Sequence, residues 1–90
     1  MTVSFYGSVL DYVGDERTDG RTIEMGAAPS VRALIGLLGG RYGEPFLEFL
    51  LGEDTCFFLV NGASLMATGG LDTPLGAGDT VEILPFVDGG

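Results

Sequence analysis

The sequence predicts one small α+β domain, in which a main helix packs on one face of a mixed sheet. Three observations support this fold class: strand-like alternation near both ends of the chain, an unbroken apolar run at residues 56–60, and one capped amphipathic segment at residues 30–42. The chain has 90 residues, which is enough for a single core without disulfides or a structural metal. Apolar residues make up 46 % of the chain and charged residues 19 %, a composition typical of a folded domain.

Two antiparallel strands are expected at the start of the chain. Residues 2–9 alternate polar and apolar side chains, which places Val3 and Phe5 on one face. Residues 14–20 contain no apolar side chain and predict a hairpin loop, so the second strand, at residues 21–25, should pair with the first. The acidic residues of this loop lack the later bidentate carboxylate of an EF-hand, so we interpret the loop as a solvated turn.

The main helix is predicted to begin after Ser30, a residue type that caps helix N-termini by accepting from their free N–H groups. Three glycines lie in its second half, and each costs about 1 kcal/mol relative to alanine in a helix interior. We therefore expect a loose last turn. Close approach of the helix to a partner could explain the glycines, and so could simple tolerance of glycine at these positions. The apolar residues follow one stripe of a helix of about three turns and should pack on the sheet: Val31, Leu34, Ile35, Leu38 and Tyr42.

A short second helix is expected at residues 44–52, with Pro45 in its first turn and Gly52 at its end. It carries more large apolar side chains than one short helix can bury, so one or two could stay exposed as a partner contact. Residues 56–60 form the unbroken apolar run, which predicts a strand buried, or nearly buried, on both faces and at or near the centre of the sheet. Cys56 is interpreted as a core residue of this strand. The large side chains of the second helix are Phe46, Leu47, Phe49 and Leu50.

The last part of the chain predicts a hairpin and a final strand. Asn61-Gly62 is a tight-turn dipeptide, residues 63–66 would form a short return strand, and residues 69–75 an irregular connection. Residues 80–84 alternate polar and apolar side chains, and Pro85 should end this strand because it has no N–H for the ladder. The order of elements predicts the ubiquitin-like β-grasp arrangement, with a sheet of about four to five strands.

The domain is therefore expected at residues 1–84, followed by an extended tail at residues 85–90. Six extended residues reach roughly 20 Å, far enough to enter the active site of another protein. Gly89 and Gly90 lack a Cβ atom, so this C-terminal diglycine can pass a narrow channel. The carboxylate of Gly90 would be the reactive group. The alternative is a frayed and inert end.

Composition narrows the classes of function. The 13 acidic residues and four arginines give a net charge of −9, which argues against binding to nucleic acid or an anionic membrane and favours a basic protein partner. The acidity could equally serve solubility alone. The chain has no histidine and only one cysteine, which excludes Ser-His and Cys-His pairs, an intrachain disulfide and an iron–sulfur cluster. No basic leader or long apolar run is present, so a cytoplasmic protein is expected.

The chain resembles the ubiquitin-like sulfur carriers of the MoaD and ThiS type, most closely the small subunit of molybdopterin synthase. The resemblance covers the whole chain, weakly over its first half and specifically over its last thirty residues. Two positions depart from the usual tail of that family, which has a second proline where this chain has Phe86 and a small residue where it has Asp88. These departures leave the chemistry possible and bear on the choice of partner. The resemblance rests on residues 60–62 (Val-Asn-Gly), 69–75 (Gly-Gly-Leu-Asp-Thr-Pro-Leu), 78–85 (Gly-Asp-Thr-Val-Glu-Ile-Leu-Pro) and 87–90 (Val-Asp-Gly-Gly).

The resemblance implies a protein that is not catalytic alone and holds no cofactor or metal. An activating enzyme of the MoeB or ThiF type would use ATP to adenylate Gly90, and a sulfur donor would convert the adenylate to a thiocarboxylate. The acceptor would be an enzyme such as the MoaE-like large subunit of molybdopterin synthase, in molybdenum or tungsten cofactor biosynthesis. The residues implied to bind these partners are Pro85, Phe86, Val87, Asp88 and Gly89.

Three other functions remain open at this point. The carrier could supply sulfur to another pathway, such as cysteine or thiamine synthesis. It could be a ubiquitin-like modifier that is attached to lysines of other proteins through Gly90, although it has no lysine on which to build chains. It could also be a β-grasp binding module whose tail has no chemical role.

Overall fold

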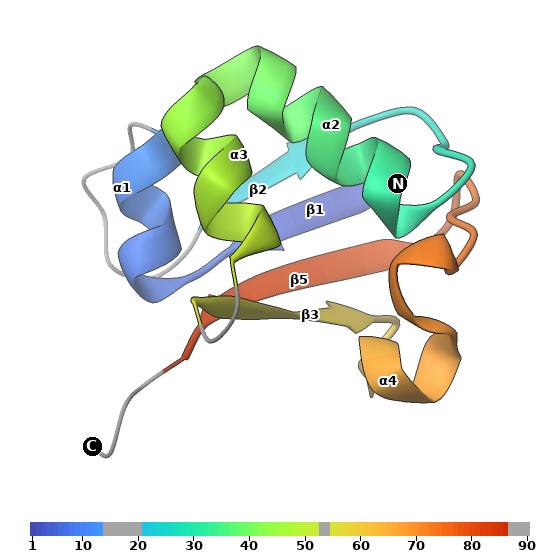
Figure 1. Ribbon diagram of the computed structural model, residues 1–90. Coiled ribbons are helices and arrows are strands. Elements are labelled where there is room, and N and C mark those ends of the chain that lie inside the picture. The colour runs from blue at the N-terminus through green and yellow to red at the C-terminus, as the bar shows by residue number, and fades with distance from the viewer. Residues whose placement is uncertain (14–20, 53–54, 87–90) are drawn as a thin grey trace.

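The computed structural model describes residues 1–13, 21–52 and 55–86. These residues form a five-stranded mixed sheet in the order β2-β1-β5-β3-β4, with the two longer helices on one face (Figure 1). This confirms the predicted α+β, ubiquitin-like β-grasp fold with one main helix. The strands are β1 (Thr2–Phe5), β2 (Arg21–Glu24), β3 (Cys56–Val60), β4 (Ala63–Ser64) and β5 (Thr80–Pro85), and the two longer helices are α2 (Val31–Tyr42) and α3 (Glu44–Leu51).

The last strand, β5, is the middle strand of the sheet. It pairs in parallel with β1, where Phe5 lies opposite Ile83, and antiparallel with β3, where Phe58 lies opposite Ile83 from the other side. The predicted antiparallel pairing of β1 with β2 is also present, with Val3 opposite Ile23. Because both neighbours hold β5, the tail leaves the domain from the most firmly paired strand.

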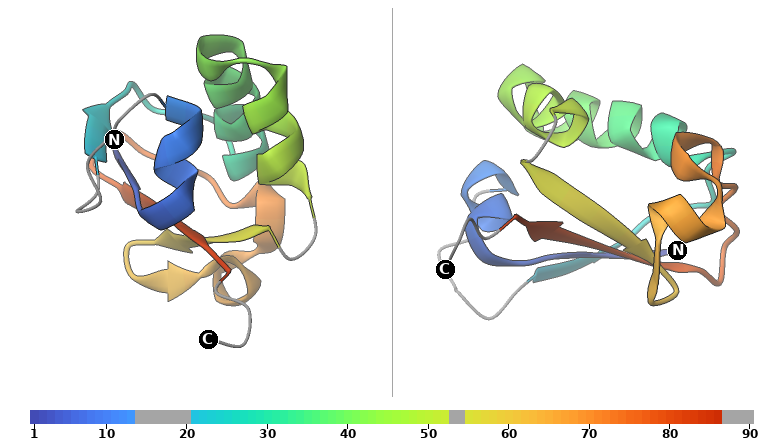
Figure 2. Two further views of the ribbon diagram at one scale, coloured as in Figure 1. Left: turned by 90° about the vertical axis from the view of Figure 1, so that its left-hand side faces the viewer. Right: turned by 60° about the horizontal axis from the view of Figure 1, so that its bottom comes forward.

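One face of the sheet packs against α2 and α3, which lie together on one side of it in both views of Figure 2. Alternate residues of the central strands are fully buried there, as the period-two pattern requires. The predicted stripe of α2 packs on them, with Tyr42 half-buried at its end. The core residues from these three elements are Val3, Phe5, Val81 and Ile83 from the sheet, and Val31, Leu34, Ile35 and Leu38 from α2.

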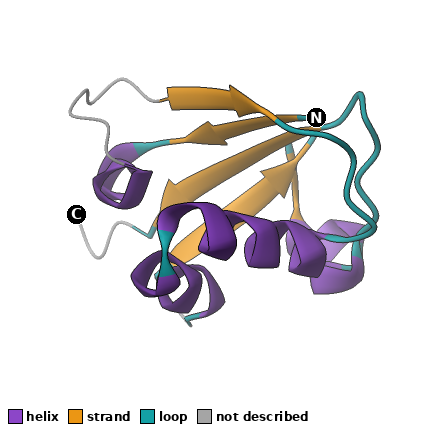
Figure 3. Cartoon of the chain, turned by 90° about the horizontal axis from the view of Figure 1, so that it is seen from above, coloured by secondary structure: helices purple, strands orange, loops and turns teal. Residues whose placement is uncertain are grey.

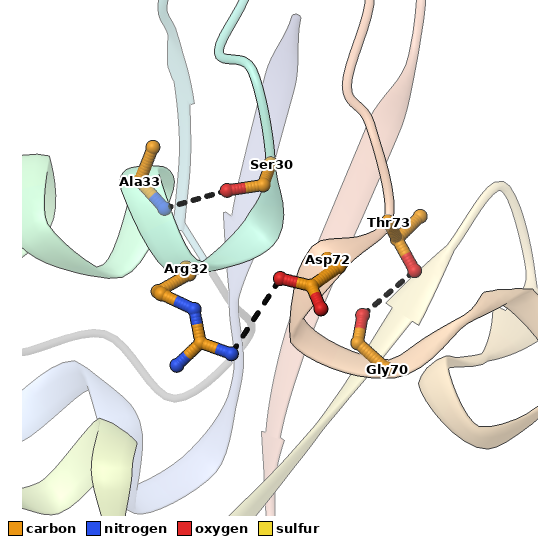
Figure 4. Close-up of polar contacts among 6 residues, drawn as sticks. All are labelled: Ser30, Arg32, Ala33, Gly70, Asp72 and Thr73. Atoms are coloured by element: carbon orange, nitrogen blue, oxygen red, sulfur yellow. Dashed lines mark hydrogen bonds and ion pairs between the residues drawn. The ribbon is translucent and has the colours of Figure 1, made fainter.

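The start of α2 is fixed by the predicted cap. The amide of Ala33 donates to the Ser30 hydroxyl over 3.1 Å (Figure 4). The 3₁₀ turn η2 (Gly70–Asp72) lies beside this cap, and the hydroxyl of Thr73, just after the turn, donates to the Gly70 carbonyl over 2.7 Å. The ion pair between Arg32 and Asp72 joins the two segments at 3.5 Å, but both side chains are exposed, so it adds little stability.

The expected loose last turn of α2 is wrong. The helix runs through Tyr42, and the amide of Gly43 donates to the Gly39 carbonyl over 2.8 Å. A Cβ atom on Gly39 would lie 2.9 Å from the Cβ of Leu47, so this glycine lets α3 approach closely, whereas Gly36 faces open space.

In α3, two of the four large apolar residues are buried and two are half-buried. The exposed residue is Leu51, at 54 %, which the sequence did not single out. The buried pair is Phe46 and Leu50, and the half-buried pair is Leu47 and Phe49.

The first strand is shorter than predicted. β1 ends at Phe5, and the chain continues into the 3₁₀ turn η1 (Gly7–Val9) and the short helix α1 (Leu10–Val13). Gly7 has a φ of +59°, which a strand cannot contain, and it turns the chain so that the apolar residues of η1 and α1 enter the core. Figure 3 shows α1 at one end of the sheet and α4 (Leu65–Thr68) at the other. The predicted hairpin loop at residues 14–20 lies outside the described residues.

The predicted burial of β3 on both faces is wrong as well. Cys56, Phe58 and Val60 face the core, whereas Phe57 is 37 % exposed and Leu59 is half-buried. The helices cover only one face, so the apolar side chains on the opposite face are partly accessible to solvent.

The predicted turn at Asn61-Gly62 is confirmed, with φ values of +52° and +84°. The return strand predicted at residues 63–66 is shorter, because β4 ends at Ser64. The Ser64 hydroxyl accepts from the amide of Met66 over 3.2 Å and caps α4. Serine's preference for capping therefore ends the strand early, and Met66 is left 95 % exposed.

Candidate functional site

The candidate site begins where β5 ends. The predicted stop at Leu84 is one residue too early, since β5 includes Pro85, which lies opposite Cys56 on β3. In an antiparallel pair only alternate residues exchange hydrogen bonds with the partner strand. The amide of Phe86 donates to the Thr55 carbonyl over 3.3 Å, so the backbone nitrogen of Pro85, one residue earlier, faces away from β3 and toward β1. β1 has already ended at Phe5. The missing N–H of Pro85 therefore leaves no gap in the ladder.

Gly7 supports the end of β5 from the other side. A Cβ atom on Gly7 would lie 2.9 Å from Cγ of Pro85, and the amide of Tyr6 donates to the Ile83 carbonyl over 3.1 Å. Pro85 thus packs directly on the backbone of the turn that opens η1. The sequence analysis missed Gly7, and the signal that could have identified it is a glycine that interrupts an alternating strand pattern.

Phe86 is the last residue that the structure describes. Its ring is 50 % exposed, and its centroid lies 5.3 Å from that of Phe57 on β3. The backbone bond to Thr55 and this aromatic contact hold the start of the tail against β3. Of the predicted site residues, Pro85 and Phe86 are therefore brought together beside β3.

The other four predicted site residues lie outside the described residues, so their placement and the expected boundary between a domain at 1–84 and a tail at 85–90 stay predictions. The four are Val87, Asp88, Gly89 and Gly90.

An open groove adjoins the tail exit. Its volume is about 430 Å³, and it runs along β3 between Phe86 and α4. Most of its lining is apolar, and sequence reasoning did not identify it, because a strand was expected at residues 63–66 where α4 begins. The lining residues are Cys56, Phe57, Phe58, Ser64, Leu65, Met66 and Phe86.

Apart from Leu84, the described residues of β2, β1 and β5 that face away from the helices are polar. The Tyr6 hydroxyl donates to the Glu82 carboxylate over 3.2 Å, and the Thr2 hydroxyl to that of Glu24 over 2.6 Å. This face is therefore divided, with an acidic half over β2, β1 and β5 and an apolar half at β3 and α4. A partner that covers both halves would need basic groups beside apolar ones.

Neither titratable group with a resolved shift supplies an acid or base at the tail exit. Burial raises the pKa of the Cys56 thiol, which the hydrogen bond from Thr55 offsets only in part, so Cys56 remains a neutral core residue at pH 7. The Gly76 amide and then the Asn61 side chain lower the pKa of Asp79, which lies just before β5, at the end away from the tail.

Within residues 1–13, 21–52 and 55–86, no three Cys, Asp or Glu side chains gather closely enough to hold a metal ion. None of the helices in this described part is long and apolar enough to cross a membrane.

Comparison with known proteins extends these observations. The sequence model of the ThiS family matches residues 3–90. The search of curated protein sequences found no match. The fold is similar to that of Mycobacterium tuberculosis CysO, with a TM-score of 0.71 and 22 % identity over 94 % of this chain and 99 % of that one.

Two further solved structures are similar. The small archaeal modifier protein 1 of Methanosarcina acetivorans has a TM-score of 0.67 and 22 % identity, over 99 % of this chain and 96 % of that one. The putative molybdopterin converting factor subunit 1 of Pyrococcus furiosus has a TM-score of 0.67 and 26 % identity, over 97 % of this chain and 99 % of that one.

Proposed function

The chain belongs to the ThiS family, which comprises ubiquitin-like sulfur carriers and protein modifiers, and on this basis we propose that it is a sulfur carrier whose Gly90 becomes a thiocarboxylate. The pathway proposed is molybdopterin synthesis, with this chain as the small subunit of the synthase. The 26 % identity to the P. furiosus converting factor subunit supports that choice. A carrier for cysteine, thiamine or another sulfur metabolite is the alternative within the same family.

The chemistry requires activation from outside the chain. A terminal carboxylate has a pKa near 3.5, so Gly90 is ionised at neutral pH and resists attack by a sulfur nucleophile. An activating enzyme of the MoeB or ThiF type would join a carboxylate oxygen to the α-phosphorus of ATP, with pyrophosphate as leaving group. Sulfide would then attack the carbonyl carbon and expel AMP, which leaves a thiocarboxylate on Gly90 and releases a proton.

This chain's own part is to present the tail. The observation that carries the proposal is the anchoring of the tail exit, where Pro85 packs on Gly7 and Phe86 bonds to Thr55 at the end of the middle strand. A rigid exit limits the volume that the tail must search and so raises the chance that its end enters a partner's active site. Val87, Asp88 and Gly89 would follow into that site, and the acceptor would be a MoaE-like large subunit.

The test is the intact mass of the protein after incubation with an activating enzyme, ATP and sulfide. We expect a shift that matches the replacement of one oxygen by sulfur, which is absent without ATP and absent when Gly90 is deleted. The deletion variant should keep the urea unfolding midpoint of the parent, because Gly90 lies beyond the paired strand. A Gly90 deletion that still gains sulfur, or a parent that gains none with several activating enzymes, would contradict the proposal.

A protein modifier is the second candidate. The fold likeness to the M. acetivorans modifier protein brings it into consideration, and the absence of lysine means that such a modifier would be attached singly and not as lysine-linked chains. The test is a search for isopeptide remnants of this tail on lysines of cellular proteins, after digestion with a protease that cleaves next to aspartate, because no lysine or arginine follows Arg41 for trypsin to cleave. Conjugates would support the modifier, whereas thiocarboxylate without conjugates would support the carrier.

A further inference from the structure

We propose that the groove beside β3, called the notch from here on, binds an extended segment of a partner protein as a sixth strand of the sheet. This segment would carry both basic and apolar side chains. The notch exists because β4 pairs only with Leu59 and Val60 and then turns into α4 after Ser64. Over residues 1–13, 21–52 and 55–86, no strand continues β4 alongside Cys56–Phe58. The first three residues of β3 therefore form an open sheet edge.

Backbone groups of β3 point into this notch. Phe86 donates to Thr55, so the odd-numbered positions of β3 exchange hydrogen bonds with β5. The alternation of an antiparallel pair then directs the amide and carbonyl groups of Cys56 and Phe58 away from β5, toward the side that β4 has left. Groups arranged in this way on a strand edge are the template for adding another strand.

Side chains form the walls of the same notch. It holds about 430 Å³ and is flanked by Met66, which is 95 % exposed, by Phe86 at 50 % and by Phe57 at 37 %. Alternate side chains of an added strand would fall between these residues. Apolar side chains are favoured there, because almost all of the lining is apolar and burying it releases water.

Charge selects the kind of occupant. Two copies of this chain would each bring a net charge of −9, so pairing of two such edges is opposed by repulsion. A segment with lysines or arginines around its apolar residues is instead attracted to the acidic surface. A partner segment is therefore favoured over a second copy.

The position of the notch gives it a purpose. Phe86 lines the groove and is the first residue beyond β5, and only β3 would separate an added strand from β5, so side chains of that strand would lie near the tail exit. If the tail carries sulfur, which rests on the proposed function, the bound segment would belong to an enzyme that activates or receives it. The binding itself requires neither ATP nor Gly90.

The binding is tested with a synthetic peptide in which valine and threonine alternate between pairs of lysines. Amide hydrogen exchange, followed by NMR, measures which backbone amides of β3 the peptide protects. We expect the peptide to slow exchange at Cys56 and Phe58, while Phe57, whose amide already faces β5, should change little. The matched control is the same peptide with N-methyl groups on its edge-facing amides, which keeps side chains and charge but removes the donors. No protection at millimolar peptide, or equal protection by the methylated peptide, overturns the proposal.

A pair of variants locates the peptide on the protein. Met66→Lys places a positive charge in the wall of the notch, and Leu37→Lys makes the same change on α2 at a residue that is 51 % exposed and does not line it. We expect Met66→Lys to weaken binding about tenfold, through lost apolar contact and repulsion of the peptide's lysines, and Leu37→Lys to change it less than about twofold. Equal effects of the two variants would overturn the proposal. So would protection of the Cys56 and Phe58 amides that appears without peptide when the protein concentration is raised, because it would identify a second copy of this chain as the occupant.

Because this assay contains no activating enzyme, a failure here leaves the mass test of Gly90 unaffected. A failure of the mass test would likewise leave the peptide result standing. The two proposals can therefore be rejected separately.

Discussion

The two ends of β5 are fixed by different forces. At its start, the backbone amide of Gly76 and the side-chain amide of Asn61 donate to the Asp79 carboxylate over 2.7 and 3.1 Å. The backbone amide of Thr80 donates to the side-chain oxygen of Asn61 over 2.9 Å. At its far end, backbone hydrogen bonds to Thr55 and Tyr6 remain, but the side-chain contacts are apolar, since Pro85 packs on Gly7 and Phe86 contacts Phe57. In their side chains, the first end is a polar clamp and the second is an apolar contact.

This difference shows that one end of β5 fixes the register of the strand and the other end presents the tail to a partner. Directional hydrogen bonds allow only one alignment, so the clamp at Asp79 fixes which residues of β5 face the core. Apolar contacts are not directional, and those at Phe86 are half exposed, so a partner can cover them without breaking any bond. The domain sets its register at one end and offers its tail at the other.

The largest loss of stability is expected from a substitution in the middle of β5, where the strand packs in the hydrophobic core. Ile83→Ala removes a fully buried side chain from β5 and should cost roughly 2–5 kcal/mol of unfolding free energy. Urea denaturation measures the loss. Leu84→Ala, on the opposite and half-buried face, is the control and should cost clearly less. Equal costs would mean that the helix-covered face does not dominate stability.

The second largest loss of stability is expected at the apolar end of β5, where Pro85 packs on Gly7. Gly7→Ala places a Cβ 2.9 Å from Pro85 at a φ of +59°, and should cost about 1–3 kcal/mol through crowding and backbone strain. Gly36→Ala is the matched control, because that position is open and helical, and it should stabilise the protein slightly.

A double variant separates the two causes of the Gly7 effect. Adding Pro85→Ala to Gly7→Ala removes the atoms that the new Cβ meets, so part of the lost stability should return while the strain at φ +59° remains. Strictly additive losses in the two variants would contradict a direct contact between Gly7 and Pro85.

These positions also show what the sequence could and could not predict. The Ser30 cap, the apolar stripe of α2 and the Asn61-Gly62 turn were predictable, because each is specified by neighbours in the chain. The early end of β4 and the contact between Gly7 and Pro85 depend on residues distant in sequence or on a choice between strand and cap. Local sequence patterns do not contain this long-range information, so they could not predict the groove between β3 and α4.

The one-sided burial of β3 shows the same limit at the scale of layers. The run Cys56–Val60 is apolar throughout, which is typical of a strand between two layers. Here the second layer is missing over Phe57, so the side chain that pattern analysis assigned to the core contributes to the surface beside the tail. A continuous apolar run can therefore mark a binding face as well as a core.

A smaller effect is expected at Phe86. Phe86→Ala removes the ring contact with Phe57 and should cost about 0.5–1.5 kcal/mol, because the ring is half exposed and the backbone bond to Thr55 remains. Thermal unfolding measures the change. Leu37→Ala removes an equally exposed side chain far from the tail and serves as control. If transfer of sulfur falls in Phe86→Ala but not in Leu37→Ala, the exposed ring acts in presentation as well as in packing.

The smallest effect is expected at the polar end, and it depends on pH. The pKa of Asp79 is lower in the folded state, because the Gly76 and Asn61 groups donate to its charged form. The stabilisation is therefore present above the unfolded-state pKa, near 3.9, and is lost as pH falls through the folded-state value. Asp79→Asn should lower the urea midpoint slightly near neutral pH and match the parent at strongly acidic pH. A difference that stays constant with pH would show that the clamp depends on shape and not on the charge of Asp79, and the contrast between the two ends of β5 would then be one of geometry alone.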